Sequence, residues 1–389
     1  MTQLESGEVY SLIPVNEPLL NGNELDYVMQ CIKTAWISSS GAFLERFEKE
    51  WAQYCGMKHG IAVCNGTVAL DMAVAAFDFP EGSEIILSSF TIISCAQAVV
   101  NNECVPVLVD CSPDTWCLDP GQVADKITEK TVAIMPVHIY GHPADMEKIL
   151  RIANRYHLKV IEDAAESHGA EVQLGRDTQC PSWKRCGGVG DASCFSFFAN
   201  KIITTGEGGM VLTNSDELAM KLRRHRNLYF GQHQKFLHEK LGGNYRLTNV
   251  QAAMGCAQLE RIEQFITRKR QMAHRYTKQL SGLPLALPAE KKWAKNVYWM
   301  YGVVLEDAIP IDAQKFARLL IKRGVQTRPF FLGMHEQPVF HRMGLFLHEH
   351  YPVCERISCR GLYLPSGQAI TDEQIDEVCS AIKEIMKPF

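Results

Sequence analysis

Residues 195–211 read FSFFANKIITTGEGGMV and place Lys201 between an aromatic run and a stretch that leads into Gly206, Gly208 and Gly209. An ammonium group is costly to bury without a partner. The ordinary interpretation of such a lysine is that its side chain reaches from an edge strand out to water. Whether Lys201 is instead a buried functional group depends on what the rest of the chain places around it.

Four short runs rich in valine and isoleucine predict strands that are buried on both faces. They lack the alternation of apolar and polar residues that a half-exposed sheet shows. These runs are EIILSS (84–89), VPVLVD (105–110), VAIMPVH (132–138) and LKVIED (158–163). Amphipathic segments at 119–128 and 144–157 lie between strands, as crossover helices do. The pattern predicts an α/β fold built on a mainly parallel sheet.

The C-terminal third has a different pattern. A long helical stretch, NVQAAMGCAQLERIEQFITRKRQMAHRYTKQL, starts at residue 249 and ends near Ser281 and Gly282. The segments after it predict a smaller α+β unit, with a strand in YWMYGVVL, a helix in IDAQKFARLLIKRG and a strand in VQTRPF. We therefore expect two domains, at 1–250 and 251–389.

Composition excludes several classes of protein. The 389 residues are 46% hydrophobic and 22% charged, and the formal net charge is −4, which gives no basic footprint for nucleic acid or an anionic membrane. No apolar run approaches the roughly 18 residues that would span a bilayer. The first residues carry no apolar core of signal-peptide length. We expect a soluble, cytoplasmic protein that binds neither nucleic acid nor membrane.

The fourteen cysteines raise the alternatives of disulfides or a metal site. Most lie in apolar, strand-like stretches, where cysteine behaves as a small hydrophobe, so reduced thiols are expected. Cys180 and Cys186 are spaced too widely for a common zinc knuckle and lack a second pair. They lie in 174–189, which its glycine, proline and mixed charges predict as a loop. His138 and His142 could form a metal pair, but they lack a third ligand. We expect no metal.

Two further polar features follow predicted strands. Asp163 stands at the carboxyl end of a buried strand, where open α/β sheets place ligand-binding groups. The run VCNGTVAL puts Gly66 and Thr67 at the start of a helix, where free N–H groups favour a phosphate. Each has an ordinary alternative, namely a surface carboxylate for Asp163 and a simple helix cap for the other two.

Taken together, a phosphate-binding turn, a carboxylate and a lysine fit one cofactor, pyridoxal phosphate. Its aldehyde condenses with a lysine amine, which removes the cost of an unpaired buried ammonium at Lys201. Asp163 would keep the pyridine nitrogen protonated. Ser196 could supply a further hydroxyl to the phosphate, and His168 could hydrogen-bond near the cofactor or fill the wall of its pocket.

Three segments resemble, in order and spacing, the motifs of the DegT/DnrJ/EryC1/StrS sugar aminotransferases. They are EDAAESHG (162–169), FSFFANKIITTGEGGMVLTN (195–214) and GGNYRLTNVQAAMGCAQL (242–259). The likeness runs from about residue 13 to residue 385. It implies the fold of type I pyridoxal-phosphate aminotransferases, with a seven-stranded, mainly parallel sheet in the large domain and a small C-terminal α+β domain.

The resemblance also implies roles for matching residues. The catalytic residues would be Lys201, bonded to the cofactor, and Asp163, paired with the pyridine nitrogen. The cofactor-binding positions would be Gly66, Thr67, Phe90, Asp163, Glu166, Ser196, Lys201 and Asn244. The substrate contacts would be Trp36, Ser38, Arg246, Tyr298 and Arg328. Because Asn244 and Arg246 would reach the neighbouring subunit's site, the implied assembly is a homodimer with shared active sites.

The implied reaction is transamination from L-glutamate to a nucleotide-linked 4-keto-6-deoxy sugar. Segments such as TAWISSSG (34–41) and VHIYGHPADME (137–147) look like those of members that use a GDP-linked sugar. Residues 174–189 and 227–241 depart from that pattern. UDP- or dTDP-linked 4-ketosugars, 3-ketosugars and keto-cyclitols are alternative substrates. A deoxygenating relative would carry histidine in place of Lys201, and a non-catalytic regulator would not need the set of Asp163 and Lys201.

Overall fold

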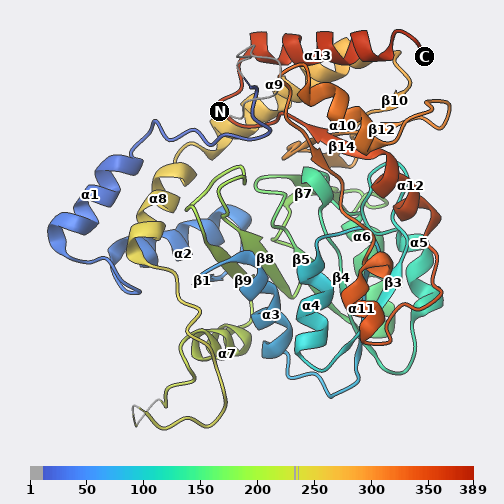
Figure 1. Ribbon diagram of the computed structural model, residues 1–389. Helices are drawn as coiled ribbons and strands as arrows, with labels where there is room; N and C mark the ends of the chain where they lie inside the picture. The colour runs from blue at the N-terminus through green and yellow to red at the C-terminus, as the bar shows by residue number, and fades with distance from the viewer. Residues whose placement is uncertain (1–11, 232–233, 235) are drawn as a thin grey trace.

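A seven-stranded sheet forms the centre of the molecule in the computed structural model, which describes residues 12–231, 234 and 236–389 (Figure 1). Two predictions fall partly outside the described residues. The expected absence of a signal peptide rests on residues 1–11, and the segment 227–241 includes residues 232, 233 and 235. The strand order is β1 (His59–Val63), β9 (Gly209–Thr213), β8 (Ala192–Ser196), β5 (Lys159–Asp163), β4 (Thr131–Met135), β2 (Glu84–Ser88) and β3 (Val105–Val109). Within this sheet only β9 runs against its neighbours, so the prediction of a mainly parallel sheet is confirmed.

The register of the strands gathers the polar strand ends at one edge of the sheet. Gly209, the first residue of β9, pairs with both Val63 and Ser196, the last residues of β1 and β8. Asp163, the last residue of β5, pairs with Cys194. The turns that follow β1, β5 and β8 therefore open on the same side, where open α/β sheets bind their ligands.

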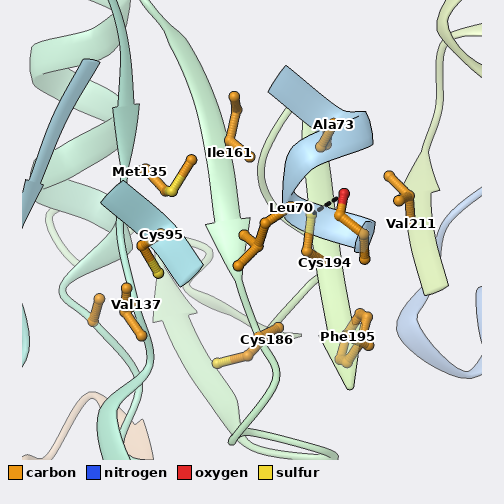
Figure 2. Close-up of a cluster of buried hydrophobic side chains, with 14 of the residues drawn as sticks. Leu70, Ala73, Cys95, Met135, Val137, Ile161, Cys186, Cys194, Phe195 and Val211 are labelled. Atoms are coloured by element: carbon orange, nitrogen blue, oxygen red, sulfur yellow. Dashed lines mark hydrogen bonds between the residues drawn. The ribbon is translucent and has the colours of Figure 1, made fainter. Parts of the chain in front are cut away.

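Helices cover both faces of this sheet, as the crossover pattern predicts. They are α2 (Ala42–Cys55), α3 (Gly66–Ala76), α4 (Ile93–Asn101), α5 (Pro120–Val123), η1 (Ala124–Lys126), η2 (Ile139–Gly141), α6 (Met146–Tyr156) and α7 (Asp216–Arg226). The predicted helix at 119–128 is thus only a short turn of α-helix followed by a 3₁₀ turn. Figure 2 shows part of the core, where Cys194 on β8 lies among Leu70 and Ala73 of α3. All fourteen cysteines are free thiols.

A second, four-stranded sheet lies beyond the large one, with α9 and α13 side by side at the top of Figure 1. Its order is β10 (Leu285–Ala286), β12 (Tyr301–Leu305), β14 (Gly361–Leu364) and β13 (Arg328–Pro329). The helices and turns of this part are α9 (Ile262–Leu280), α10 (Ala313–Ile321), η3 (Met334–Glu336), α11 (Pro338–Arg342), α12 (Pro352–Arg360) and α13 (Asp372–Met386). Side chains from α11 and α12 join the core of the large sheet, so a domain boundary at 250 stays a prediction.

The single long helix predicted after residue 249 is wrong, because the structure divides it into α8 (Asn249–Leu259) and α9. The break falls at Glu260 and Arg261. The carboxylate of Glu260 accepts hydrogen bonds from Asn23, Tyr27 and Arg46, which flank or belong to α1 (Glu24–Thr34) and α2. The partners that hold this break lie more than 200 residues away along the chain.

The prediction of a loop at 174–189 is also wrong in part, because the segment contains the strand β7 (Ser182–Arg185). This strand pairs with β6 (Glu171–Leu174), which pairs on its other side with β11 (Ala294–Lys295). The guanidinium carbon of Arg185 lies 3.9 Å from the ring centroid of Tyr54, and Cys186 is fully buried. Contacts distant in sequence therefore order this segment. Among the residues that the structure describes, no helix is long and apolar enough to cross a membrane.

Candidate active site

The start of α3 forms a small cradle against the end of β8. Asn65 caps the helix by accepting a hydrogen bond from Val68 N at 2.9 Å. A Cβ atom on Gly66 would lie 2.7 Å from the Cβ of Ser196, so the two chains touch there with no side chain between them. The Oγ1 of Thr67 lies 2.8 Å from the Oγ of Ser94. Backbone N–H groups and hydroxyls thus converge where a helix N-terminus favours a phosphate.

Asp163 is held in one orientation at the end of β5. Its side chain is buried, its Oδ1 accepts a hydrogen bond from Ala165 N at 3.0 Å, and its Oδ2 accepts one from the thiol of Cys95 at 3.1 Å. Both oxygens are therefore fixed before any ligand binds. A carboxylate of this kind can pair with a protonated ring nitrogen.

Lys201 lies in the segment after β8 rather than on an edge strand, and it is only partly exposed. Its Nζ lies 3.8 Å from the centroid of the Trp299 ring, in a cation–π contact. Burial lowers the pKa of Lys201, while the carboxylates of Glu166 and Asp163 oppose that shift. Among the described residues, Nζ forms no hydrogen bond and no ion pair. The amine is thus available to bond a ligand.

Glu166 is the second carboxylate near this amine. It is buried, and its Oε2 accepts a hydrogen bond from Tyr140 N at 2.7 Å. Burial raises the pKa of Glu166 to about 7, and the charge of Lys201 opposes the shift. Tyr140 itself has the left-handed φ of 52°. A strained backbone position therefore anchors the carboxylate that faces Lys201.

Several aromatic rings pack against one another in this region. Phe90 is fully buried, with its ring centroid 6.1 Å from that of Tyr140 and 5.7 Å from that of Phe330. His168 packs edge-on against Trp51 at 5.1 Å, and its Nε2 has no hydrogen-bond partner in the described part of the chain. Burial and the charge of Lys201 lower the pKa of His168 to about 3, so its ring is buried as a neutral group.

Two of the expected substrate residues, Arg328 and Tyr298, have different surroundings. Arg328 on β13 stands opposite Tyr363 of β14, whose ring lies 5.8 Å from that of Tyr140. Tyr298 instead lies in the apolar core of the smaller sheet. Its neighbour Trp299 contacts the lysine, although sequence reasoning assigned it no role. The strand predicted in YWMYGVVL covers this segment, but its pattern does not tell which ring faces the amine.

The remaining predicted residues lie around the start of α8, where Arg246 forms a β-bridge with Val63, two residues before the Asn65 cap of α3. Backbone carbonyls of Trp36 and Ser38 accept hydrogen bonds from Asn249, at 2.7 Å and 2.6 Å. Arg246 donates to Asn244 Oδ1 at 2.7 Å and lines a groove of about 270 Å³ with Ser39. In the described chain, no hydrogen bond or ion pair joins this group to Asp163, Glu166 or Lys201. Their role in a neighbouring subunit's site stays a prediction.

The histidines considered as a metal pair have other partners. His138 accepts a hydrogen bond from Ala144 N at Nδ1 and donates from Nε2 to Glu162 at 3.0 Å. His142 donates from Nδ1 to Pro143 O at 2.7 Å. Within the described ranges, no three His, Cys, Asp or Glu side chains are grouped to hold a metal ion.

The residues present fit pyridoxal phosphate. The cradle of Gly66, Thr67 and Ser196 suits its phosphate, the fixed carboxylate of Asp163 suits its ring nitrogen, and the unpaired amine of Lys201 suits its aldehyde. A phosphate, a pyridine nitrogen and an aldehyde occur together in this cofactor, so the three features are explained by one ligand.

Comparisons with known proteins agree with this chemistry. The model of the DegT/DnrJ/EryC1/StrS aminotransferase family matches residues 18–383. GDP-perosamine synthase of Caulobacter vibrioides is 40% identical over 376 residues, which cover 96% of this chain and 98% of that protein. GDP-perosamine synthase of Escherichia coli O157:H7 is 37% identical, with the same coverage. The crystal structure of S. venezuelae DesV has a TM-score of 0.85 and 31% identity, and the match covers 94% of each chain. The chain belongs to the DegT/DnrJ/EryC1/StrS aminotransferase family and is a pyridoxal-phosphate-dependent enzyme.

Proposed function

We propose that this enzyme transfers the amino group of L-glutamate to C4 of GDP-4-keto-6-deoxymannose and so makes GDP-perosamine. One observation carries the proposal: relatives named GDP-perosamine synthase match the chain over 96% of its length, at 40% and 37% identity. Lys201 supports amination rather than deoxygenation, because the deoxygenating members of the family carry histidine at this position.

The residues of the chain then have distinct tasks. The bound cofactor supplies a ring that takes up electrons from the reacting carbon. The amine of Lys201 takes the proton from Cα of L-glutamate and, in the second half of the reaction, returns a proton to C4 of the sugar. Asp163 keeps the ring nitrogen protonated, and burial lowers the pKa of Lys201, which favours the neutral amine that acts as a base.

We also propose that two copies of the chain share their active sites. Asn244 and Arg246 lie just before α8. In the described chain no hydrogen bond or ion pair joins them to Lys201, and Arg246 has no carboxylate partner. An uncompensated guanidinium suits a phosphate group. In a homodimer it would meet the cofactor or nucleotide phosphate bound by the other subunit.

A substrate panel tests the proposed sugar. The purified enzyme is given L-glutamate and, in turn, GDP-, UDP- and dTDP-linked 4-keto-6-deoxy sugars, a 3-ketosugar and a keto-cyclitol. We expect the GDP-linked sugar to have the highest kcat/KM, by about tenfold or more. A difference of about 1–3 kcal/mol in how the pocket fits two substrates gives discrimination of this size. Magnetic resonance of the product should place the new amine at C4.

Two controls separate the chemistry from the substrate. Borohydride reduction with peptide mapping should fix the cofactor on Lys201, and Lys201→Ala should fold but give no turnover. Preference for a dTDP- or UDP-linked sugar would overturn GDP-perosamine as the product while leaving the aminotransferase intact. A label on another lysine would overturn the role of Lys201.

A further inference from the structure

A buried lysine lies outside the set of residues described so far. Lys269 on α9 is 1% exposed. Its Nζ donates hydrogen bonds to Trp299 O, at 2.8 Å, and to Ser366 O. No carboxylate in the described chain forms an ion pair with it, and burial lowers its pKa to about 7. A buried amine without a counter-ion is costly, whereas an apolar side chain would fill the same space at no such cost.

The bond to Trp299 connects Lys269 to the catalytic lysine. The Trp299 side chain is nearly buried, its Nε1 donates to Asn200 O at 2.7 Å, and its ring face meets Lys201 Nζ at 3.8 Å. Lys269 on α9 thus binds the backbone carbonyl of Trp299. The indole ring of Trp299 in turn contacts two consecutive residues of the lysine segment, Asn200 and Lys201. This contact path from Lys269 through Trp299 to Lys201 is continuous.

The backbone near Trp299 explains why such a support is needed. Tyr298 has the left-handed φ of 49°, which bulky residues rarely adopt. Tyr298 N is held by Asn296 Oδ1 at 2.7 Å on one side. The next carbonyl is that of Trp299, which Lys269 binds. Two hydrogen bonds therefore hold this irregular backbone beside the indole, one at Tyr298 N and one at Trp299 O.

We propose that Lys269 is a positioning residue for the transamination: by binding the Trp299 carbonyl it fixes the indole against Lys201 and so holds the amine where it moves the proton. The inference rests on the proton-transfer role of Lys201 and is independent of which sugar accepts the amino group. It also links the helix of the smaller sheet to the reacting amine.

Variants at both ends of the path test this role. Lys269→Met removes both hydrogen bonds with little change in volume, and Trp299→Phe keeps a ring but loses the Nε1 bond. The glutamate half-reaction is followed in a single turnover by release of 2-oxoglutarate. We expect Lys269→Met to slow it about 10- to 100-fold, since small misplacements of reacting groups cost this much. The concentration of glutamate at half-maximal rate should stay within about twofold.

A second readout does not depend on the loaded enzyme. In the cofactor-free protein, competitive acetylation followed by peptide mass analysis gives the pH profile of Lys201 reactivity. Lys269→Met should shift this profile, because the ring that faces Nζ moves. Lys278→Met is the matched control, since Lys278 lies on the same helix with its side chain exposed. This control should leave both the rate and the profile unchanged.

A double-mutant cycle decides whether Lys269 acts through Trp299. If it does, Lys269→Met combined with Trp299→Phe should be no slower than the worse single variant, because the two changes break one path. Additive losses would overturn the proposal. So would a Lys269→Met protein with a lower melting temperature but a wild-type rate and Lys201 profile, which would make Lys269 a structural tie only.

If Lys269→Met does not fold, Lys269→Gln takes its place, because a neutral amide can still donate to both carbonyls. Lys269→Gln should keep most of the wild-type single-turnover rate, and Trp299→Phe still reports the second step of the path. A Lys269→Gln protein that loads cofactor but is more than about tenfold slower than wild type would contradict positioning by these hydrogen bonds.

Discussion

Gly66 and Ser196 approach so closely that a Cβ atom on Gly66 would lie 2.7 Å from the Cβ of Ser196. The first residue of α3 and the last residue of β8 come from segments 130 positions apart in the chain, and the register of β1, β9 and β8 brings them together. This contact leaves the first turn of α3 open to a phosphate.

Gly66→Ala should therefore weaken cofactor binding by about tenfold or more, because the added methyl group forces the cradle apart. Equilibrium dialysis with pyridoxal phosphate measures this loss, and thermal unfolding of the cofactor-free protein measures the accompanying loss of stability. Adding Ser196→Gly to the same chain should restore part of the stability, since it removes the atom that the new Cβ meets, but not the affinity. Wild-type affinity in Gly66→Ala would exclude this turn as the phosphate site.

Asp163→Asn should bind the cofactor and fold normally but slow the glutamate half-reaction by about two orders of magnitude or more. A neutral amide cannot keep the ring nitrogen protonated. Cys95→Ala removes only the thiol that donates to Oδ2, so its loss of rate should be much smaller. Single-turnover release of 2-oxoglutarate compares the three proteins, and an Asp163→Asn rate close to wild type would rule out the pairing.

Local sequence was sufficient for the features that depend on neighbours in the chain. The valine- and isoleucine-rich runs became β2, β3, β4 and β5, because strands buried on both faces need only continuous apolar residues. The cradle at Gly66 and the strand-end position of Asp163 follow from the same strand-turn-helix logic. These features could be predicted because their causes lie within a few residues.

Features set by distant contacts could not be predicted. The break at Glu260 is held by Asn23 and other residues more than 200 positions away. The contact of Trp299 with Lys201 follows a left-handed residue, Tyr298, in an irregular segment, so neither strand nor helix periodicity predicts it. The partners of Lys269 are two backbone carbonyls, and such contacts leave no pattern in the sequence.

His168 should make the protein sensitive to acid. Burial and the charge of Lys201 lower its folded-state pKa to about 3, whereas an exposed histidine titrates near 6.5. Between these values the unfolded chain binds a proton that the folded chain does not, so the free energy of unfolding falls as pH drops from about 6.5 to about 3. Unfolding in denaturant across this range measures the slope.

His168→Gln, which cannot titrate, should be less stable at neutral pH but show a smaller loss of stability between pH 6.5 and the acid limit of folding. His348, which is exposed and forms no ion pair among the described residues, gives the matched control, since His348→Gln should leave the slope unchanged. An unchanged slope in His168→Gln would show that this ring is not kept neutral by the fold.

The last prediction concerns the shared active site. We expect Lys201→Ala and Arg246→Ala each to be inactive as homodimers, and their heterodimer to be active. If Arg246 acts in the neighbouring subunit's site, both lesions of the heterodimer fall in one site and the other site is whole. Recovery should approach half of wild-type activity for each heterodimer, isolated by two different affinity tags.

If Arg246 acts within its own subunit, each site of the heterodimer keeps one lesion and no activity returns. Mass measurement under native conditions verifies that the purified species carries one copy of each variant. Mixing two Lys201→Ala chains with different tags is the negative control for exchange. Failure of verified heterodimers to recover activity would place Arg246 in its own subunit's site and remove the main support for an active site shared between two copies.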